Sequence, residues 1–257
     1  MRRIRSLGLS AFTAFTAFAA SAVFFAGERD ATACGASPGG PVGHMMCGPD
    51  DGPLEHRYRG AVSYSFANTR ISFGDGLKHD LNRHLVMATF DYRLDKKKAL
   101  TIGAGGLLVG NLRNGQNYVM ESGPALMVGY SLGFLKEEKN VPFGVFTVVG
   151  SFVHTATRPD GPLSLRQGSS GYTALDARVG VMVGKTFFDR LSVYAAGRLF
   201  GGPVFWRIAD EAKLGTDIYH YQLGGGLIVQ LPAGLSLYGE GIAVGERGAV
   251  AGISITP

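Results

Sequence analysis

Apolar and polar side chains alternate along the chain from residue 57 onward, and no stretch there keeps a helical period for three turns. The alternation comes in runs of about 9–13 residues that are separated by turn signals. Each run predicts one β-strand. The predicted strands cover residues 57–66, 85–94, 100–110, 119–132, 142–155, 172–184, 190–200, 218–231, 235–244 and 249–256.

The connections between these strands alternate in length. Residues 95–99, 135–141, 187–189 and 232–234 form short turns, residues 67–84, 111–118, 156–171 and 201–217 form longer loops, and only 245–248 departs from the alternation. This pattern is typical of a transmembrane barrel, whose tilted strands need about 9–11 residues to cross the hydrocarbon core. We therefore predict an all-β fold over residues 57–257, a closed antiparallel up-and-down transmembrane β-barrel of about ten strands.

One face of each predicted strand is apolar, and in a barrel this face contacts lipid. The aligned residues are Tyr58, Val62, Tyr64 and Phe66; Val86, Ala88, Phe90 and Tyr92; Leu126, Val128, Tyr130 and Leu132; Phe143, Val145, Thr147, Val149 and Val153; and Leu175, Ala177, Val179, Val181 and Val183. Aromatic residues gather at the strand ends, as in interfacial girdles. Near the short turns these are Tyr58, Tyr92, Phe134, Phe187 and Phe188, and near the long loops Phe66, Tyr118, Phe152, Tyr172, Phe205, Trp206, Tyr219 and Tyr221.

The opposite face carries charged and polar residues in the middle of strands. They are Arg59, Asp91, Arg93, Glu121, Asp176, Arg178, Arg198, His220, Gln222 and Glu240. In a soluble sandwich such groups would face solvent or be buried at a high cost, whereas in a barrel they can pair across the lumen. We therefore predict a lumen charge network. Because its charges nearly cancel, it favours a filled or narrow interior over a wide porin, which needs about 16 strands.

In this arrangement the chain resembles the small outer-membrane β-barrels of Gram-negative bacteria, such as the OmpA-like and opacity-type barrels. The resemblance is architectural, covers residues 57–256 and includes no family-specific motif. It implies an outer-membrane location and outer-membrane lipid as a partner. The chain departs from the family pattern at its end, where Ser254-Ile255-Thr256-Pro257 stands in place of a terminal aromatic residue.

The N-terminal segment has the pattern of an export signal. Three arginines at positions 2, 3 and 5 precede an apolar run over residues 7–27, and Ala31-Thr32-Ala33 supplies a small-x-small cleavage site. We predict a signal peptide over residues 1–33, and a Gly- and Pro-rich periplasmic segment over 34–56. Cleavage after Ala22 or Ala26, an uncleaved anchor and lipidation of Cys34 are the alternatives.

The two cysteines, Cys34 and Cys47, both follow the predicted signal. In an exported chain two nearby cysteines usually pair, and closing this loop would contribute roughly 3 kcal/mol in the chain-entropy model. We therefore predict a Cys34–Cys47 disulfide. The rival is a soft-metal site, because His44-Met45-Met46-Cys47 places imidazole, thioether and thiol groups together.

Charge and composition narrow the function further. The formal net charge is +5, of which the first 33 residues supply +2, and the remainder is too weak and scattered for nucleic-acid binding. We expect no metal, no cofactor and no enzyme activity, and the oligomeric state stays open. The predicted function is a structural barrel or a narrow selective channel for a small solute.

Two other functions remain as alternatives. One is an outer-membrane lipid hydrolase that would use Ser151, His154 and Glu121, although residues three apart on a strand point to opposite faces. The other is a secreted, ligand-binding β protein.

His79, Asp80 and His84 in the first long loop could meet a cation, but such residues more often form a solvated loop.

Overall fold

The computed structural model describes residues 57–160, 170–208 and 211–257. The predicted signal peptide (1–33), the periplasmic segment (34–56) and the Cys34–Cys47 disulfide, with its metal and lipidation alternatives, lie outside the described residues. Every regular element in the described part is a strand. Within these ranges no helix is long and apolar enough to cross a membrane.

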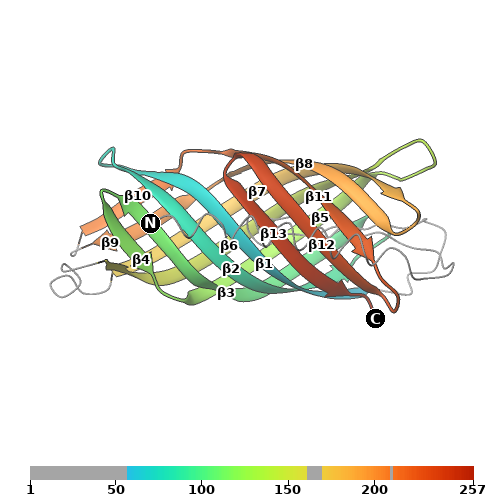
Figure 1. Ribbon diagram of the computed structural model, residues 1–257, viewed down its shortest axis with the longest axis horizontal. Helices are drawn as coiled ribbons and strands as arrows, with labels where there is room; N and C mark the ends of the chain where they lie inside the picture. The colour runs from blue at the N-terminus through green and yellow to red at the C-terminus, as the bar shows by residue number, and fades with distance from the viewer. Residues whose placement is uncertain (1–56, 161–169, 209–210) are drawn as a thin grey trace, which may run out of the picture. The chain divides into compact units, whose positions relative to one another are not determined.

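The described strands pair into one antiparallel sheet that closes on itself (Figure 1). They are β1 (Tyr58–Phe73), β2 (Lys78–Arg93), β3 (Lys98–Asn114), β4 (Gln116–Met120), β5 (Gly123–Leu135), β6 (Phe143–Pro159), β7 (Ser170–Phe187), β8 (Leu191–Gly201), β9 (Pro203–Ile208), β10 (Glu211–Asp217), β11 (Tyr221–Gln230), β12 (Leu235–Gly245) and β13 (Arg247–Ile255).

Three pairs of these segments each occupy one position in the barrel wall. Segments β4 and β5 both pair with β3 and β6, and segments β8 and β9 both pair with β7. The third pair is β10 and β11, which occupy the next position in the wall: β11 pairs with β8, and β10 pairs with β9. The wall therefore has ten positions, and the ring closes between β13 and β1. The fold is the closed up-and-down β-barrel of about ten strands that the alternation predicts.

The ring narrows toward one end. The hairpin of β12 and β13 turns at residues 245–247, and beyond this turn β10 pairs directly with β1, with Phe73 opposite Gly215. At that end the closed circuit is β1, β2, β3, β4, β6, β7, β9 and β10, which is eight strands. This hairpin ends below the narrow end of the barrel, so its turn needs no long loop. This explains why the connection at 245–248 is short and departs from the alternation of loop lengths.

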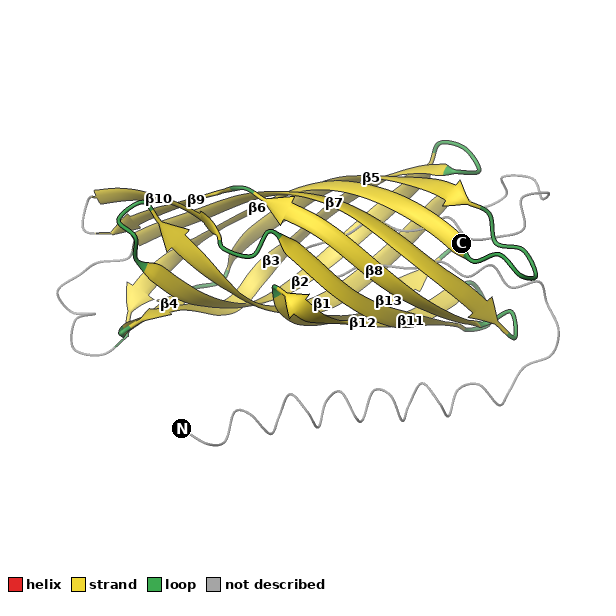
Figure 2. Cartoon of the chain, turned by 90° about the horizontal axis from the view of Figure 1, so that it is seen from above, coloured by secondary structure: helices red, strands yellow, loops and turns green. Residues whose placement is uncertain are grey.

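Several strands are longer than the sequence pattern predicts. Segment β1 has 16 residues and β3 has 17, so most of the segments predicted as loops at 67–84, 111–118 and 201–217 are strand instead. In Figure 2 the loops drawn in green, which connect the described strands, are short beside the strands. The error arose because the outward face becomes polar in these segments, which resembles a loop in sequence although the backbone pairing continues.

The outer surface carries an apolar belt. On β1, Tyr58, Val62 and Tyr64 are 45–51% exposed although they are large and apolar. The outward residues from Tyr58 to Phe66 span nine residues, about the length that a tilted strand needs to cross the hydrocarbon core. Beyond Phe66 the outward residues are polar. The seven residues Ala67–Phe73 therefore extend the wall past the belt.

The predicted faces are right for most strands and wrong for β6. The inward side of β6 carries Phe143, Val145, Thr147, Val149 and Val153, all buried. Its outward side carries Phe146, Val148 and Phe152 instead. Both faces of β6 are apolar, so alternation alone could not distinguish the lipid side from the lumen side. Three aromatic residues predicted for the girdle near the long loops, Tyr118, Tyr172 and Trp206, likewise point into the barrel.

The assignment of faces on β6 predicts the effect of a charge. Replacing the outward Val148 by arginine should destabilise the barrel in a phospholipid bilayer by about 2–4 kcal/mol, because the guanidinium would enter hydrocarbon. The matched control is Val141→Arg, since Val141 is similarly exposed but lies in the turn before β6. Urea unfolding in lipid vesicles measures both changes, and equal losses would contradict the placement of the belt.

Candidate functional site in the barrel lumen

A bidentate ion pair joins β8 and β12, the two neighbours of β11 in the barrel wall. The Arg198 guanidinium donates to both carboxylate oxygens of Glu240, at 2.7 and 2.9 Å. The Tyr194 hydroxyl donates to the same carboxylate at 3.0 Å. The side chains of Arg198 and Glu240 are only 3% and 1% exposed. Two parallel charge-assisted bonds fix the orientation of both groups, so this pair ties two wall strands that are not neighbours.

A second ionic cluster surrounds the turn between β12 and β13. The Glu246 side chain is fully buried and accepts hydrogen bonds from Arg83 (3.2 Å), Arg178 (3.2 Å) and Gln222 (2.7 Å). Arg178 also donates to Asp176 at 2.5 Å. Strands β2, β7 and β11 thus converge on one carboxylate. This convergence pins the hairpin turn inside the barrel, at the level where the ring narrows.

The local backbone explains why this turn can enter the lumen. Gly245 has a φ of +83°, and a Cβ atom at this position would lie 1.8 Å from the Tyr221 carbonyl oxygen. Only glycine combines this conformation with so close an approach to β11. The tight turn directs Glu246 inward and leaves Arg247 on the outside of the wall.

Two further polar contacts lie on inward faces. Arg59 donates to the Ser254 hydroxyl at 2.5 Å, and the Thr101 hydroxyl donates to Asp91 at 2.5 Å. Arg59 and Asp91 occupy opposing positions on β1 and β2, and both are buried. Arg59 and Asp91 therefore each have a hydrogen-bonding partner on a neighbouring strand, β13 and β3 respectively.

Not every residue of the predicted charge network joins these clusters. The structure brings Asp176 and Arg178 together, and Arg198 and Glu240 together. Arg93 is half-buried on β2, and no ion pair of the described residues includes it. Two placements are wrong. Glu121 pairs with the outward Arg158, and the exposed His220 lies beside the Phe200 carbonyl, because the wall is interrupted at both positions.

Sequence reasoning missed two charged members of the clusters. Arg83 lay in a segment predicted as a loop, and Glu246 lay in the short connection at 245–248 that departs from the alternation of loop lengths. The inward period of β2, with Leu81 and Leu85 on either side, could have placed Arg83 in the lumen. No local signal distinguishes an inserted turn from a solvated one, so Glu246 could not have been found from the sequence.

Apolar side chains fill much of the remaining lumen. A larger cluster includes Phe73 on β1, Leu112 on β3, Tyr172 on β7 and Trp206 on β9, which are 0–3% exposed. Trp206 donates to the Thr157 hydroxyl at 2.9 Å and packs edge-on against Tyr118. A smaller buried cluster consists of Phe143, Val145, Met182, Tyr194, Ala196, Ile228, Tyr238 and Val250. An eight-strand ring leaves room for side chains and little else, which is what the larger cluster shows at the narrow end.

An ion pair at the loop side of the narrow end joins β10 to the turn that follows β1. Lys213 on β10 donates to Asp75, in the turn between β1 and β2, at 2.5 Å. This hydrogen bond, helped by the backbone N–H of Leu77, lowers the pKa of Asp75 below its ordinary value. The pair adds a side-chain contact to the backbone pairing of β10 with β1.

The catalytic group of the alternative lipid hydrolase does not assemble. Ser151 faces inward beside Asp176 and Met127, whereas His154 faces outward and contacts the Thr173 hydroxyl at 2.8 Å. Glu121 is engaged with Arg158. An acyl-transfer site needs a nucleophile, a base and an orienting group within hydrogen-bond reach, and these three residues do not provide them.

The three residues considered for a cation are also separated. His79 is buried against Trp206, with ring centroids 5.1 Å apart, Asp80 pairs with Arg70, and His84 contacts the Tyr64 hydroxyl. Across residues 57–160, 170–208 and 211–257, no group of three histidine, cysteine or acidic side chains could hold a metal ion.

The buried Arg198–Glu240 pair predicts an asymmetric response to mutation. Arg198→Leu alone should cost about 3–5 kcal/mol, because it leaves the Glu240 carboxylate buried without its counter-ion. The double variant Arg198→Leu/Glu240→Leu should recover most of that loss. Equilibrium unfolding of the three proteins in the same vesicles measures the difference. A double variant at least as unstable as the single one would show that the pair is not an isolated buried unit.

Comparison with known proteins gives distant matches among solved structures alone: no protein-family model and no curated protein matches the chain. The outer membrane protease OmpT from Escherichia coli is 9% identical, with 78% of this chain and 96% of that chain covered and a TM-score of 0.48. The translocator domain of the autotransporter NalP from Neisseria meningitidis is 9% identical, with 79% and 90% covered and a TM-score of 0.46. The COG4313 outer membrane channel from Pseudomonas putida F1 is 11% identical, with 81% and 99% covered and a TM-score of 0.38.

Proposed function

We propose that this chain is an outer-membrane β-barrel with a sealed lumen, a structural protein of the membrane rather than an open pore. The apolar belt supports insertion into a bilayer, and closed barrels of this type are outer-membrane structures. The narrow end faces the outside in this proposal, and the N-terminal side of β1 faces the periplasm. The Cys34–Cys47 disulfide and the signal over 1–33 belong to the same proposal.

The observation that carries the proposal is the narrowing of the ring from ten strands to eight. At eight strands the interior is just wide enough for side chains. Leu112 and Trp206 fill it there with exposures of 0% and 1%. Below them, Glu246 occupies the lumen at the step in the wall. Such an interior offers water and solutes no continuous path.

A narrow selective channel is the weaker alternative. A channel needs polar groups that exchange partners with a passing solute. Here the Arg198 guanidinium already makes two bonds to Glu240, and the Glu246 carboxylate already accepts three. Both carboxylates are therefore engaged by side chains of other strands, which favours the role of a tie between wall strands over that of a solute site. Around Glu246, the Arg83 Nε, Arg178 Nη1 and Gln222 Oε1 atoms are buried without a hydrogen-bond partner among the described residues.

The two other functions have less support. A lipid hydrolase lacks an assembled triad at Ser151 and His154. A secreted ligand-binding protein would not expose large apolar residues around its whole wall, since such patches mark contact with membrane or protein. Among them are Ile102, Leu126, Val128, Leu175, Val179 and Leu199, with exposures of 42–67%.

The sealed lumen predicts that the protein conducts no ions across a bilayer. Full-length protein reconstituted in a planar bilayer should give no single-channel steps, because side chains fill the narrow end. Regular open steps from the unaltered protein would refute the sealed barrel and favour the channel.

Two measurements test, independently of conductance, whether the protein inserts into the bilayer. The folded protein should float with lipid vesicles, and heating should change its mobility on a detergent gel. The variant Trp206→Ala/Tyr118→Ala, which removes two aromatic rings from the lumen, is compared with the unaltered protein in the conductance measurement. The two rings pack edge-on with centroids 4.8 Å apart. A variant that conducts beside a silent parent shows that these side chains close the lumen.

A further inference from the structure

The outer wall changes character just above the apolar belt. Phe66 and His84 oppose each other on β1 and β2, and the Tyr64 hydroxyl contacts His84 at 2.5 Å. These aromatic rings form the upper rim of the belt. Two residues further along β1, the next outward pair consists of asparagines, and beyond it the outward side chains are charged. This region we call the polar collar, and it consists of Asn68, Arg70, Lys78, Asp80, Asn82, Asn111, Arg113 and Arg247.

The collar is ordered by strand register. In one row Arg247, Asn68, Asn82 and Asn111 lie opposite one another across β13, β1, β2 and β3. In the next row Arg70, Asp80 and Arg113 lie opposite one another across β1, β2 and β3. Opposing residues in an antiparallel pair have Cβ atoms about 4.5–5.5 Å apart, so each row presents a continuous line of polar groups.

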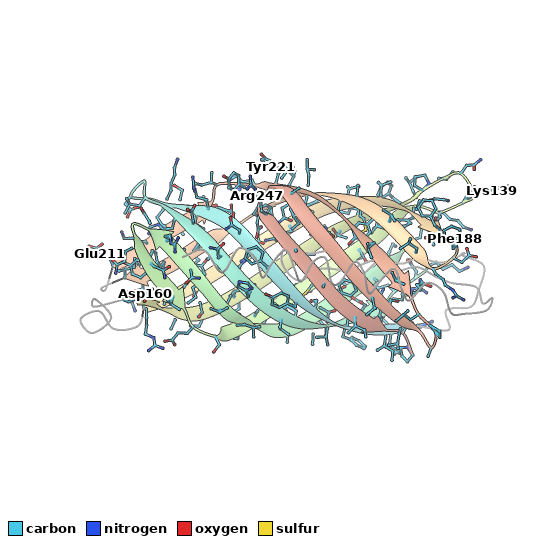
Figure 3. The ribbon with its side chains drawn as sticks, in the orientation of Figure 1. Lys139, Asp160, Phe188, Glu211, Tyr221 and Arg247 are labelled. Atoms are coloured by element: carbon cyan, nitrogen blue, oxygen red, sulfur yellow. The ribbon has the colours of Figure 1, made fainter. Side chains whose placement is uncertain are left out.

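The collar carries an excess of positive charge. It contains four cations and one carboxylate, and Asp80 pairs with Arg70 at 2.6 Å. In the part of the chain that the structure describes, neither Arg113 nor Arg247 has an ion-pair partner, and both are exposed. Figure 3 shows Arg247 on the outside of the barrel, between the end with Asp160 and Glu211 and the end with Lys139 and Phe188.

We propose that the polar collar binds the phosphorylated sugar headgroup of a membrane glycolipid. Guanidinium groups suit phosphate, because their fixed fork of donors matches its oxygens. Asparagine amides offer both donors and acceptors, which sugar hydroxyls require. The acyl chains would lie below, against the apolar belt at Tyr64 and Val109, so the headgroup and the chains meet their partners on one surface.

The position of the collar argues for lipid over other anions. It adjoins the belt without a gap, since Phe66 precedes Asn68 on the outward face of β1 and Val109 precedes Asn111 on that of β3. A ligand confined to the bilayer therefore has its charged end at the height of the collar. The assignment rests on the proposed placement of the barrel in the outer membrane.

Equilibrium binding of a fluorescent, acylated glucosamine disaccharide bisphosphate to the full chain in mixed micelles tests the proposal. Arg113→Gln/Arg247→Gln should weaken binding about tenfold or more, because two charge-assisted contacts to phosphate are lost. The matched control is Arg207→Gln, since Arg207 is an exposed outward arginine on β9, away from the collar. Equal weakening in the control would overturn the collar as the site.

Two further ligands separate the contributions of phosphate and of lipid. The same glycolipid without its phosphates should bind the unaltered protein as weakly as the phosphorylated glycolipid binds the double variant. If removal of the phosphates left the affinity unchanged, phosphate recognition would be refuted. Soluble glucosamine 1-phosphate should compete poorly, and competition as strong as the lipid's would overturn the lipid assignment. Heat-dependent gel mobility checks that each variant is folded. These outcomes do not depend on conductance, so a conducting barrel would refute the sealed lumen and leave the collar to be judged by binding.

Discussion

The rest of this structure depends on one constraint, that every backbone N–H and C=O in the wall must find a partner on a neighbouring strand. In hydrocarbon an unpaired strand edge costs several kcal/mol for each polar group, so the sheet has to close. The hairpin of β12 and β13 ends early, at residues 245–247, and above the belt this leaves the edges of β1 and β10 without these neighbours. An open edge there would be a row of unpaired backbone groups. Direct pairing of Ser72 with Thr216 and of Phe73 with Gly215 closes that gap.

The narrowing of the ring then decides what the interior can hold. An eight-strand ring is filled by side chains, and the inward residues of the long strands are largely apolar there, with Trp206 at the centre of the aromatic contacts. Where the ring is wider, ionic groups share the space. The two main clusters can do so because their carboxylates, Glu240 and Glu246, accept hydrogen bonds from groups on other strands. The same geometry that closes the wall therefore also closes the lumen.

The outer surface divides at nearly the same height. Below Phe66 the outward residues of β1 suit hydrocarbon, and above it they suit water and headgroups. The wall itself continues, so the polar collar is built on paired strands instead of on loops. Side chains on paired strands have fixed spacing and direction, which makes a row such as Asn68, Asn82 and Asn111 a more precise surface than a loop could offer.

The sequence by itself determined the fold class, the closure and the number of wall positions, because an alternating pattern with turn signals states where the chain reverses and which face is apolar. It also identified Arg198 and Glu240 as inward candidates, since polar residues stood out against apolar neighbours. Only the tertiary structure decided the faces of β6, where both sides are apolar, and the length of strands whose outward face becomes polar. It alone brought Glu246 into the lumen beside Arg83 and Arg178, because that contact depends on where a hairpin ends relative to strands more than 60 positions away. The alternation of apolar and polar residues along a strand indicates which way a side chain points, whereas the closure of the barrel decides which other side chains it contacts.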